Sequence, residues 1–302
     1  MRIPRLATAL AVATLCLAAS ASSAGAALPV IYNFPAAVAA SSVQPGGSPA
    51  GANDWSCRPS AAHPRPVVLV NGTFANQITS WNALSPLLKN NGYCVYTFNY
   101  GGLFLGQIGS YGPIAASARE LQAEVDKVLA STGAAKVDLV GWSQGGMMPR
   151  YYLKNLGGAP KVGHLVGLAS SNHGTTLNGL ATLSGYFPGS RQLLAAGCPA
   201  CTDQLAGSPF LTALNAGGDT VPGVKYTVIE SRYDEVVTPY QSAFLSGPDV
   251  TNIRVQDQCI LDAGEHLSMP YDHIVDRDVL NALDPASARA PLCTPIVPAV
   301  GG

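Results

Sequence analysis

Short runs of apolar residues recur along this chain and alternate with longer stretches that have helical periodicity. Short apolar runs predict buried strands, and apolar residues on one helical stripe predict packed helices. The predicted strands are residues 67–70, 93–100, 136–140, 162–169, 226–230 and 253–256. The predicted helices are residues 81–91, 114–132, 146–156 and 275–283. Strands that alternate with helices predict an α/β fold built on a mostly parallel, doubly wound sheet of about six strands.

The first residues have the pattern of a secretory signal peptide. Arg2 and Arg5 precede an apolar run, residues 6–19, and Ala24-Gly25-Ala26 supplies a small-residue cleavage site. We therefore predict a signal peptide over residues 1–26. The apolar run is too short for a membrane anchor, and no other stretch could span a bilayer. We expect a secreted, extracellular protein without a transmembrane anchor.

Three further segments differ in composition. Residues 27–52 are rich in Ala, Ser, Pro and Gly, which predicts a flexible N-terminal arm or a processed linker with residues 31–34 as its only apolar anchor. Residues 53–302 carry all the predicted strands and are expected to form one domain. Within it, residues 170–224 have mixed character with many Gly and Pro, and we interpret them as an insertion over one end of the sheet.

The low charge of the chain argues against nucleic acid as a partner, and its cysteines indicate an oxidising compartment. Only 12% of the residues are charged and the net charge is −1, so no basic surface is available for nucleic acid. Six cysteines remain after the signal segment is removed, and an even number in an exported chain predicts disulfides. The pair Cys198 and Cys201 forms a C-x-x-C. Export favours a small structural bridge there over a redox or zinc site.

The segment around Ser143 carries the strongest chemical signal. A predicted strand leads into Gly141-Trp142-Ser143-Gln144-Gly145, a G-x-S-x-G pentapeptide, and a predicted helix follows. Strand, sharp turn and helix are the context of a nucleophile elbow, which holds a serine hydroxyl above the sheet edge. Thr73, Ser143 and Asp234 each follow a predicted strand, so they should meet at the carboxyl edge of the sheet.

A serine nucleophile needs an acid and a histidine downstream, in that order for this fold. Asp234 follows the predicted fifth strand and is our candidate acid, with the adjacent Glu235 as the alternative. His266 lies in a loop after the last strand and is the candidate base. His273, at the start of the final helix, is the other possibility. His164 lies inside a strand, and His173 precedes the acid and breaks the order.

Two backbone N–H groups must stabilise the oxyanion of such a reaction. One should belong to Gln144, which follows the serine. The other should come from the loop after the first strand, Asn71-Gly72-Thr73, at Thr73. The same tripeptide also fits an ordinary turn or the glycosylation pattern N-x-[ST].

These motifs together resemble the secreted α/β-hydrolase lipases grouped with Candida antarctica lipase B and its bacterial exported relatives. Residues 142–146 have the WSQGG core, residues 233–237 resemble the acid segment, and residues 255–266 resemble the cysteine-to-histidine segment. The resemblance covers roughly residues 57–293. It implies an α/β-hydrolase catalytic domain with Ser143, Asp234 and His266 as the triad.

The resemblance also implies roles for the surrounding residues. Thr73 and Gln144 would form the oxyanion hole, with the Thr73 hydroxyl as an additional donor. Trp142 would line the alcohol side of the substrate pocket and Val236 the acyl side. The implied disulfides are Cys57–Cys94 and Cys259–Cys293, whereas Cys198–Cys201 has no counterpart. The insertion at residues 170–224 lies where a small lid would be expected.

The sequence therefore predicts a serine ester hydrolase acting on lipid esters, as a triacylglycerol lipase does. No metal or organic cofactor is required by this chemistry, and we expect a monomer whose partner is a lipid or ester substrate. A short-chain carboxylesterase and an acyltransferase use the same triad, so both stay open. A non-catalytic binding protein usually lacks a triad member, and here all three positions are filled.

Overall fold

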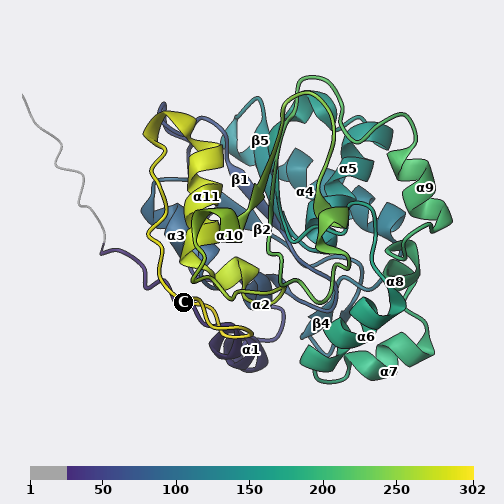
Figure 1. Ribbon diagram of the computed structural model, residues 1–302. Coiled ribbons are helices and arrows are strands. Elements are labelled where there is room, and N and C mark those ends of the chain that lie inside the picture. The colour runs from purple at the N-terminus through teal and green to yellow at the C-terminus, as the bar shows by residue number, and fades with distance from the viewer. Residues whose placement is uncertain (1–25) are drawn as a thin grey trace, which may run out of the picture.

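A central parallel sheet organises the computed structural model, which describes residues 26–302 (Figure 1). Its six strands lie in the order β2-β1-β5-β6-β7-β8, and each neighbouring pair is parallel. The strands are β1 (Val67–Val70), β2 (Val95–Thr97), β5 (Val137–Trp142), β6 (Val162–Leu168), β7 (Lys225–Glu230) and β8 (Val250–Arg254). Two short strands, β3 (Leu103–Phe104) and β4 (Ile108–Gly109), form a separate antiparallel hairpin. The predicted α/β architecture is confirmed.

Helices cover both faces of this sheet, as a parallel sheet requires. On one side lie α2 (Gln77–Trp81), α3 (Leu84–Asn90) and α11 (His273–Leu283), and on the other lie α4 (Ile114–Thr132) and α5 (Gln144–Asn155) (Figure 1). Every residue of β1 and β5 is buried. This explains why β1 is a continuous apolar run, and why the one carboxylate inside β5, Asp138, is paired with Arg65. The remaining short 3₁₀ helices are Ala159–Lys161, Tyr240–Ala243, Met269–Tyr271 and Pro285–Ser287.

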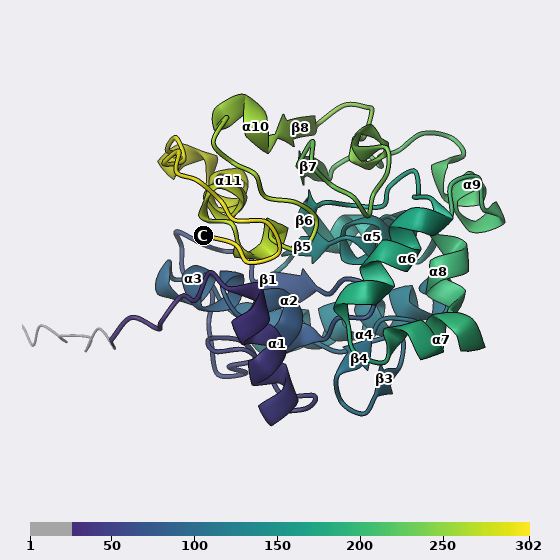
Figure 2. The ribbon, with the colours of Figure 1, turned by 60° about the horizontal axis from the view of Figure 1, so that its bottom comes forward.

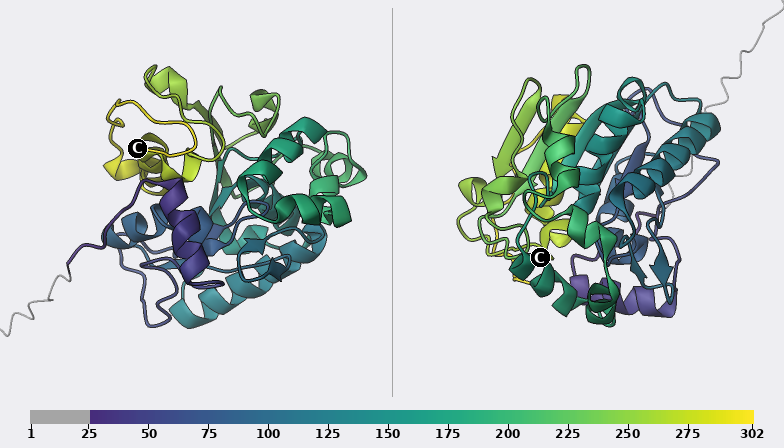
Figure 3. Two further views of the ribbon diagram at one scale, coloured as in Figure 1. Left: turned by 90° about the horizontal axis from the view of Figure 1, so that it is seen from below. Right: turned by 90° about the vertical axis from the view of Figure 1, so that its right-hand side faces the viewer.

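The predicted insertion is helical. It contains α6 (Leu177–Tyr186), α7 (Ser190–Ala196), α8 (Pro199–Asp203) and α9 (Pro209–Asn215). These four helices gather at one end of the molecule, on the right of Figure 2 and of the left panel of Figure 3. They follow β6, so they lie beyond the carboxyl ends of the central strands.

The predicted flexible arm differs from the structure, because it contains helix α1 (Phe34–Val43). Asn33 caps this helix by accepting a hydrogen bond from the backbone of Ala36, and Pro35 stands in its first turn. Phe34 is buried and packs edge-on against Phe187 and Tyr271. The segment is therefore attached to the domain by an apolar anchor.

Element boundaries also differ in three places. The strand predicted at residues 93–100 is confined to β2 (Val95–Thr97). The sixth strand is β8 (Val250–Arg254), ahead of the predicted residues 253–256, and the short helix α10 (Val255–Gln258) follows it at once. β8 is an edge strand whose Thr251 and Asn252 are exposed, so its apolar signal is weak. The helix predicted at residues 81–91 is two shorter helices, α2 and α3.

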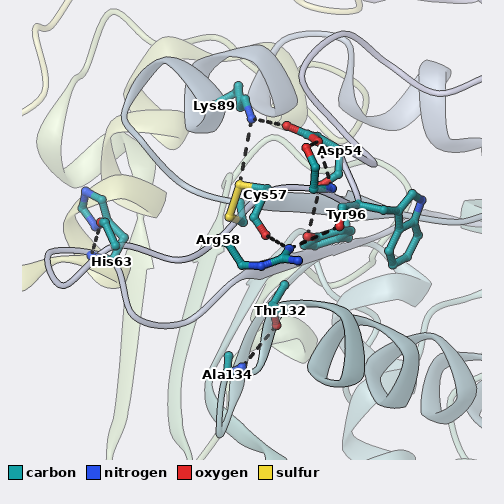
Figure 4. Close-up of a disulfide and its surroundings, with 12 residues drawn as sticks. Asp54, Cys57, Arg58, His63, Lys89, Tyr96, Thr132 and Ala134 are labelled. Atoms are coloured by element: carbon teal, nitrogen blue, oxygen red, sulfur yellow. Dashed lines mark hydrogen bonds and ion pairs between the residues drawn. A yellow bond between two sulfur atoms is a disulfide. The ribbon is translucent and has the colours of Figure 1, made fainter. Parts of the chain in front are cut away.

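Three disulfides are present, with the pairings predicted from the sequence and its resemblance. Cys57–Cys94 joins the segment before β1 to the segment before β2 (Figure 4). Cys198–Cys201 closes the first turn of α8, and Cys259–Cys293 joins the loop after α10 to the C-terminal tail. The sheet edge and the tail are thus covalently fixed.

The predicted signal peptide, residues 1–26, lies outside the described residues except for its last position. Across the part of the chain that the structure describes, no helix has both the length and the apolar character needed to cross a bilayer.

Candidate active site

The turn between β5 and α5 has the geometry of a nucleophile elbow. Ser143 has φ 57° and ψ −122°, a strained conformation for a residue with a side chain. A Cβ at Gly141 would overlap the carbonyl of Gly145, and one at Gly145 would overlap the carbonyl of Val70. The two glycines of the motif are therefore required by close backbone packing around the serine.

The loop after β1 lies directly beside Ser143. A Cβ added at Gly72 would stand 3.3 Å from the Cβ of Ser143 and 2.9 Å from the Trp142 ring. The Ser143 backbone N–H donates to the carbonyl of Leu168 over 2.8 Å, which fixes the turn to the end of β6. Only 2% of Ser143 is exposed, so the site is nearly covered in this state.

Asp234 and His266 form a buried pair. The Nδ1 atom of His266 lies 2.7 Å from Asp234 Oδ2, and both side chains are inaccessible to solvent. Asp234 Oδ1 accepts hydrogen bonds from the backbone N–H groups of Val236 and Val237, at 2.8 and 2.7 Å. One carboxylate oxygen thus anchors its own loop, and the other orients the imidazole.

The second ring nitrogen of His266, Nε2, is buried and has no hydrogen-bond partner among residues 26–302. Burial disfavours the imidazolium, but the charge and hydrogen bond of Asp234 outweigh it, and the pKa of His266 is raised above its usual range. A buried imidazole with one nitrogen fixed and one unpaired is prepared to accept a proton from a neighbouring group.

The other candidate histidines have different partners. His273 caps the C-terminal tail, with Nδ1 2.6 Å from the Gly302 carbonyl and Nε2 3.0 Å from the Leu292 carbonyl. His164 lies 2.9 Å from Thr227 Oγ1, and burial lowers its pKa to about 4. His173 lies 3.1 Å from Asp219. None of the three contacts Asp234, so the structure brings only His266 to the predicted acid.

The two predicted oxyanion residues also contact each other. The Thr73 hydroxyl donates to Gln144 Oε1 over 2.7 Å. A third residue joins them: Gln204 Nε2 lies 2.8 Å from Thr73 Oγ1 and 3.2 Å from Gln144 Oε1. Gln204 is the C-cap of α8 and was not predicted from the sequence, since no motif there indicates a site residue.

Trp142 and Val236, the predicted substrate-binding residues, are buried in this structure. The Trp142 indole donates to the carbonyl of His266 over 3.0 Å, and the two rings lie 5.6 Å apart. The Val236 carbonyl accepts a hydrogen bond from the Thr175 hydroxyl. These contacts hold the loops that carry His266 and Asp234. That Trp142 and Val236 contact a substrate stays a prediction.

A second carboxyl group behind Asp234 was also missed. Glu230, the last residue of β7, is fully buried, and its Oε1 accepts from the Ser231 N–H. Burial and then the charge of Asp234 raise the pKa of Glu230 well above its usual range. Burial and the nearby carboxylate thus favour the protonated form of Glu230. The half-buried Glu235 has its pKa raised to about 7 by burial and then by Glu265.

Over residues 26–302, His, Cys, Asp and Glu side chains do not gather in groups of three or more that could hold an ion.

Two of the curated proteins that this chain resembles are lipases, and each match covers part of the chain. A triacylglycerol lipase from Pseudarthrobacter phenanthrenivorans is 41% identical over 96 residues, which are 30% of this chain and 28% of the relative. Lipase B from Pseudozyma antarctica is 26% identical over 169 residues, 52% of this chain and 46% of the relative. The chain thus spans less than half the length of either curated relative in these matches. The predicted resemblance to the lipase B group is confirmed.

Solved structures and a family match extend the likeness over most of the chain. The crystal structure of Aspergillus fumigatus lipase B superimposes with a TM-score of 0.57 at 20% identity, covering 82% of this chain and 57% of that one. This similarity shows the α/β-hydrolase fold. Residues 64–276 match the family described as Lipase (class 2). Since that match covers more than half of the sequence, the chain belongs to the class 2 lipase family.

Proposed function

We propose that this protein is a secreted serine hydrolase that cleaves lipid esters, as a triacylglycerol lipase, through an acyl-enzyme on Ser143. The observation that carries this proposal is the strained elbow of Ser143 together with the buried Asp234–His266 pair, in which His266 Nε2 has no hydrogen-bond partner within the described part of the chain. These are the nucleophile, acid and base that acyl transfer needs.

In the proposed reaction, His266 Nε2 takes the proton of the Ser143 hydroxyl while Oγ attacks the ester carbonyl. Asp234 stabilises the imidazolium that forms, through its contact with Nδ1. The backbone N–H groups of Gln144 and Thr73 stabilise the oxyanion. His266 then gives its proton to the leaving alcohol. In the second half of the reaction a water molecule, deprotonated by His266, attacks the acyl-enzyme, and the carboxylic acid and free Ser143 are released.

The test uses a serine-directed phosphonate and the variant Ser143→Ala. We expect the parent enzyme to lose activity, with the adduct on the Ser143 peptide by mass spectrometry. Ser143→Ala should remain folded and lose roughly 10⁴-fold or more in kcat. An active parent that is not labelled at Ser143 would exclude this mechanism, and a folded parent without esterase activity would favour a binding protein.

Substrate class is tested separately with p-nitrophenyl esters of increasing acyl length and with emulsified triglyceride. Turnover of the emulsion and of long-chain esters would support a lipase. Activity confined to short soluble esters would indicate a carboxylesterase, and preferential transfer to added alcohol would indicate an acyltransferase.

Export is proposed from the signal pattern of residues 1–26 and is consistent with the three disulfides. N-terminal sequencing of protein recovered from the culture medium tests it. A mature chain that begins near residue 27 is expected, and retention of Met1 in a cell-associated protein would contradict it.

A further inference from the structure

The side chain of Gln204 connects the helical insertion to both predicted oxyanion residues. Its Nε2 lies within hydrogen-bond distance of Thr73 Oγ1 at 2.8 Å, of the Ala200 carbonyl at 3.0 Å and of Gln144 Oε1 at 3.2 Å. Its Oε1 accepts from the Ser171 hydroxyl at 2.9 Å. Gln204 is only 2% exposed. A buried amide with polar contacts on both ends is fixed in orientation.

The backbone around Gln204 is held as firmly as its side chain. Its carbonyl accepts from the Thr175 N–H at 2.9 Å, and its own N–H donates to the carbonyl of Ala200 at 3.1 Å. The preceding turn of α8 is closed by the Cys198–Cys201 disulfide. The Ala200 N–H also donates to the Tyr111 carbonyl, which attaches α8 to the start of α4. Gln204 is thus presented to the site from a rigid element.

The direction of the hydrogen bonds in this cluster limits what the Thr73 hydroxyl can donate to. The Thr73 hydroxyl has one hydrogen, and here it is given to Gln144 Oε1 at 2.7 Å. In this state the hydroxyl cannot also donate to an oxyanion. If it rotated toward substrate, Gln144 Oε1 would lose that donor, and a buried acceptor without a donor destabilises the state that contains it.

Gln204 removes that cost. Its amide nitrogen carries two hydrogens and stands near both Thr73 Oγ1 and Gln144 Oε1. When the Thr73 hydrogen leaves, one Gln204 hydrogen can stay on Thr73 Oγ1 and the other can serve Gln144 Oε1. Only the contact to the Ala200 carbonyl weakens, and that carbonyl already accepts the backbone N–H of Gln204.

We propose that Gln204 is a positioning residue that lets the Thr73 hydroxyl turn from Gln144 to the oxyanion in the transition state. This inference rests on the proposed ester hydrolysis at Ser143 and adds a residue to it. The donated hydrogen bond into Thr73 Oγ1 also makes the hydroxyl a stronger donor, because hydrogen bonds in a chain polarise one another.

The experiment is a double-mutant cycle between Gln204→Leu and Thr73→Val. Gln204→Leu should lower kcat by about 10- to 100-fold with KM within about threefold, since only transition-state stabilisation is lost. In the Thr73→Val background, which has no hydroxyl to position, Gln204→Leu should change kcat by less than about twofold. The inhibition constant of an alkyl boronic acid, whose tetrahedral adduct carries an oxyanion, should rise with the fall in kcat/KM.

Gln122→Leu is the matched control. Gln122 also donates from Nε2 to a backbone carbonyl, that of Leu156, but it lies on α4 and not in the site. It should leave kcat and boronate binding within about twofold.

Gln204→Glu is the second variant, to be used if Gln204→Leu does not fold, because glutamate keeps the shape of the glutamine side chain. Its ionised form has no hydrogen to donate, whereas its protonated form has one. The activity of Gln204→Glu relative to the parent should therefore rise as the pH is lowered, which a purely structural role would not produce.

The proposal is overturned if Gln204→Leu lowers kcat equally with and without the Thr73 hydroxyl, or leaves kcat unchanged. It is also overturned if the Gln204→Glu ratio does not vary with pH. The proposed function fails separately, through an inactive parent or an active Ser143→Ala enzyme, so the two outcomes are distinguishable.

Discussion

The two disulfides that close long loops should each contribute more to stability than Cys198–Cys201, which closes a very short one. Cys57–Cys94 spans a sequence separation of 37 residues, whereas Cys198–Cys201 spans 3. In the chain-entropy description a bridge stabilises by restricting the unfolded chain, and the effect grows with the logarithm of loop length. That relation gives about 3.9 kcal/mol for the long loop and about 1.9 kcal/mol for the short one.

The test compares Cys57→Ala/Cys94→Ala with Cys198→Ala/Cys201→Ala. For a chain of this size, 1 kcal/mol corresponds to a shift in Tm of about 2–4 °C. We therefore expect Tm to fall by about 8–15 °C in the first variant and about 4–8 °C in the second. Cys94, Cys198 and Cys201 are buried and Cys57 is partly buried. The packing cost is therefore comparable in the two variants, and the difference in Tm reports mainly loop closure.

The assay is thermal unfolding followed by circular dichroism, with urea titrations to confirm the free energies. The surroundings of Cys57 provide an internal check, because Lys89 Nζ lies 3.2 Å from Asp54 Oδ2 beside this bridge (Figure 4). Lys89→Met should shift Tm by only about 2 °C or less, since exposed ion pairs contribute little. Equal Tm losses in the two cysteine variants, or a larger loss for Cys198–Cys201, would refute the loop-length reasoning.

Three further predictions concern the site and the core. His266→Ala should lower kcat by roughly 10⁴-fold or more, while His273→Ala should stay within about tenfold; equal losses in ester turnover would contradict the assignment of the base. The pKa of His266 is raised, and His266 must be neutral to act as the base, so kcat/KM should fall as the pH is lowered, with a midpoint above about pH 6.5. Glu235→Gln removes one of the charges that raise the pKa of His266, so a pH–rate profile of this variant should show the fall in kcat/KM at lower pH. Burial raises the pKa of the fully buried Asp276 well above its usual value, so the protonated carboxyl stabilises the fold. This stabilisation is lost as the pH rises toward the folded-state pKa, at up to about 1.4 kcal/mol per pH unit. The Tm of Asp276→Asn should therefore rise relative to that of the parent between pH 5 and pH 9, and a constant difference in Tm would contradict this.

The parts of the site that depend on local geometry could be predicted from the sequence. Gly141 and Gly145 are required by backbone contacts within one strand-turn-helix unit, so their spacing around Ser143 carries the signal. Asp234 and His266 could be placed because the order of elements limits which residues reach the same sheet edge. The sequence could identify these side chains, but not that His266 contacts the acid through Nδ1 while Nε2 has no partner among the residues that the structure describes.

Two errors in the fold have a common origin. In residues 27–52 the prediction followed composition and missed a helix, although Asn33 and Pro35 are good starting residues for one; the apolar anchor that includes Phe34 was expected. At β8, an exposed edge position allowed polar residues, so the apolar run pointed to later residues. In both cases the decisive energy comes from packing against distant parts of the chain, which a short window does not contain.

Gln204 shows the same limit within the site itself. It contacts Thr73 across 131 residues of sequence and Gln144 across 60, and a glutamine after a short helix has no distinguishing pattern. Its position depends on how α8 packs against the start of α4 and on the turn closed by Cys198–Cys201. The insertion therefore does more than cover the sheet edge, because it supplies the donor that satisfies Gln144 when the Thr73 hydroxyl turns away. Changes in residues 170–224 that move α8 should thus alter the rate of the chemical step, even where they leave the Ser143, Asp234 and His266 geometry intact.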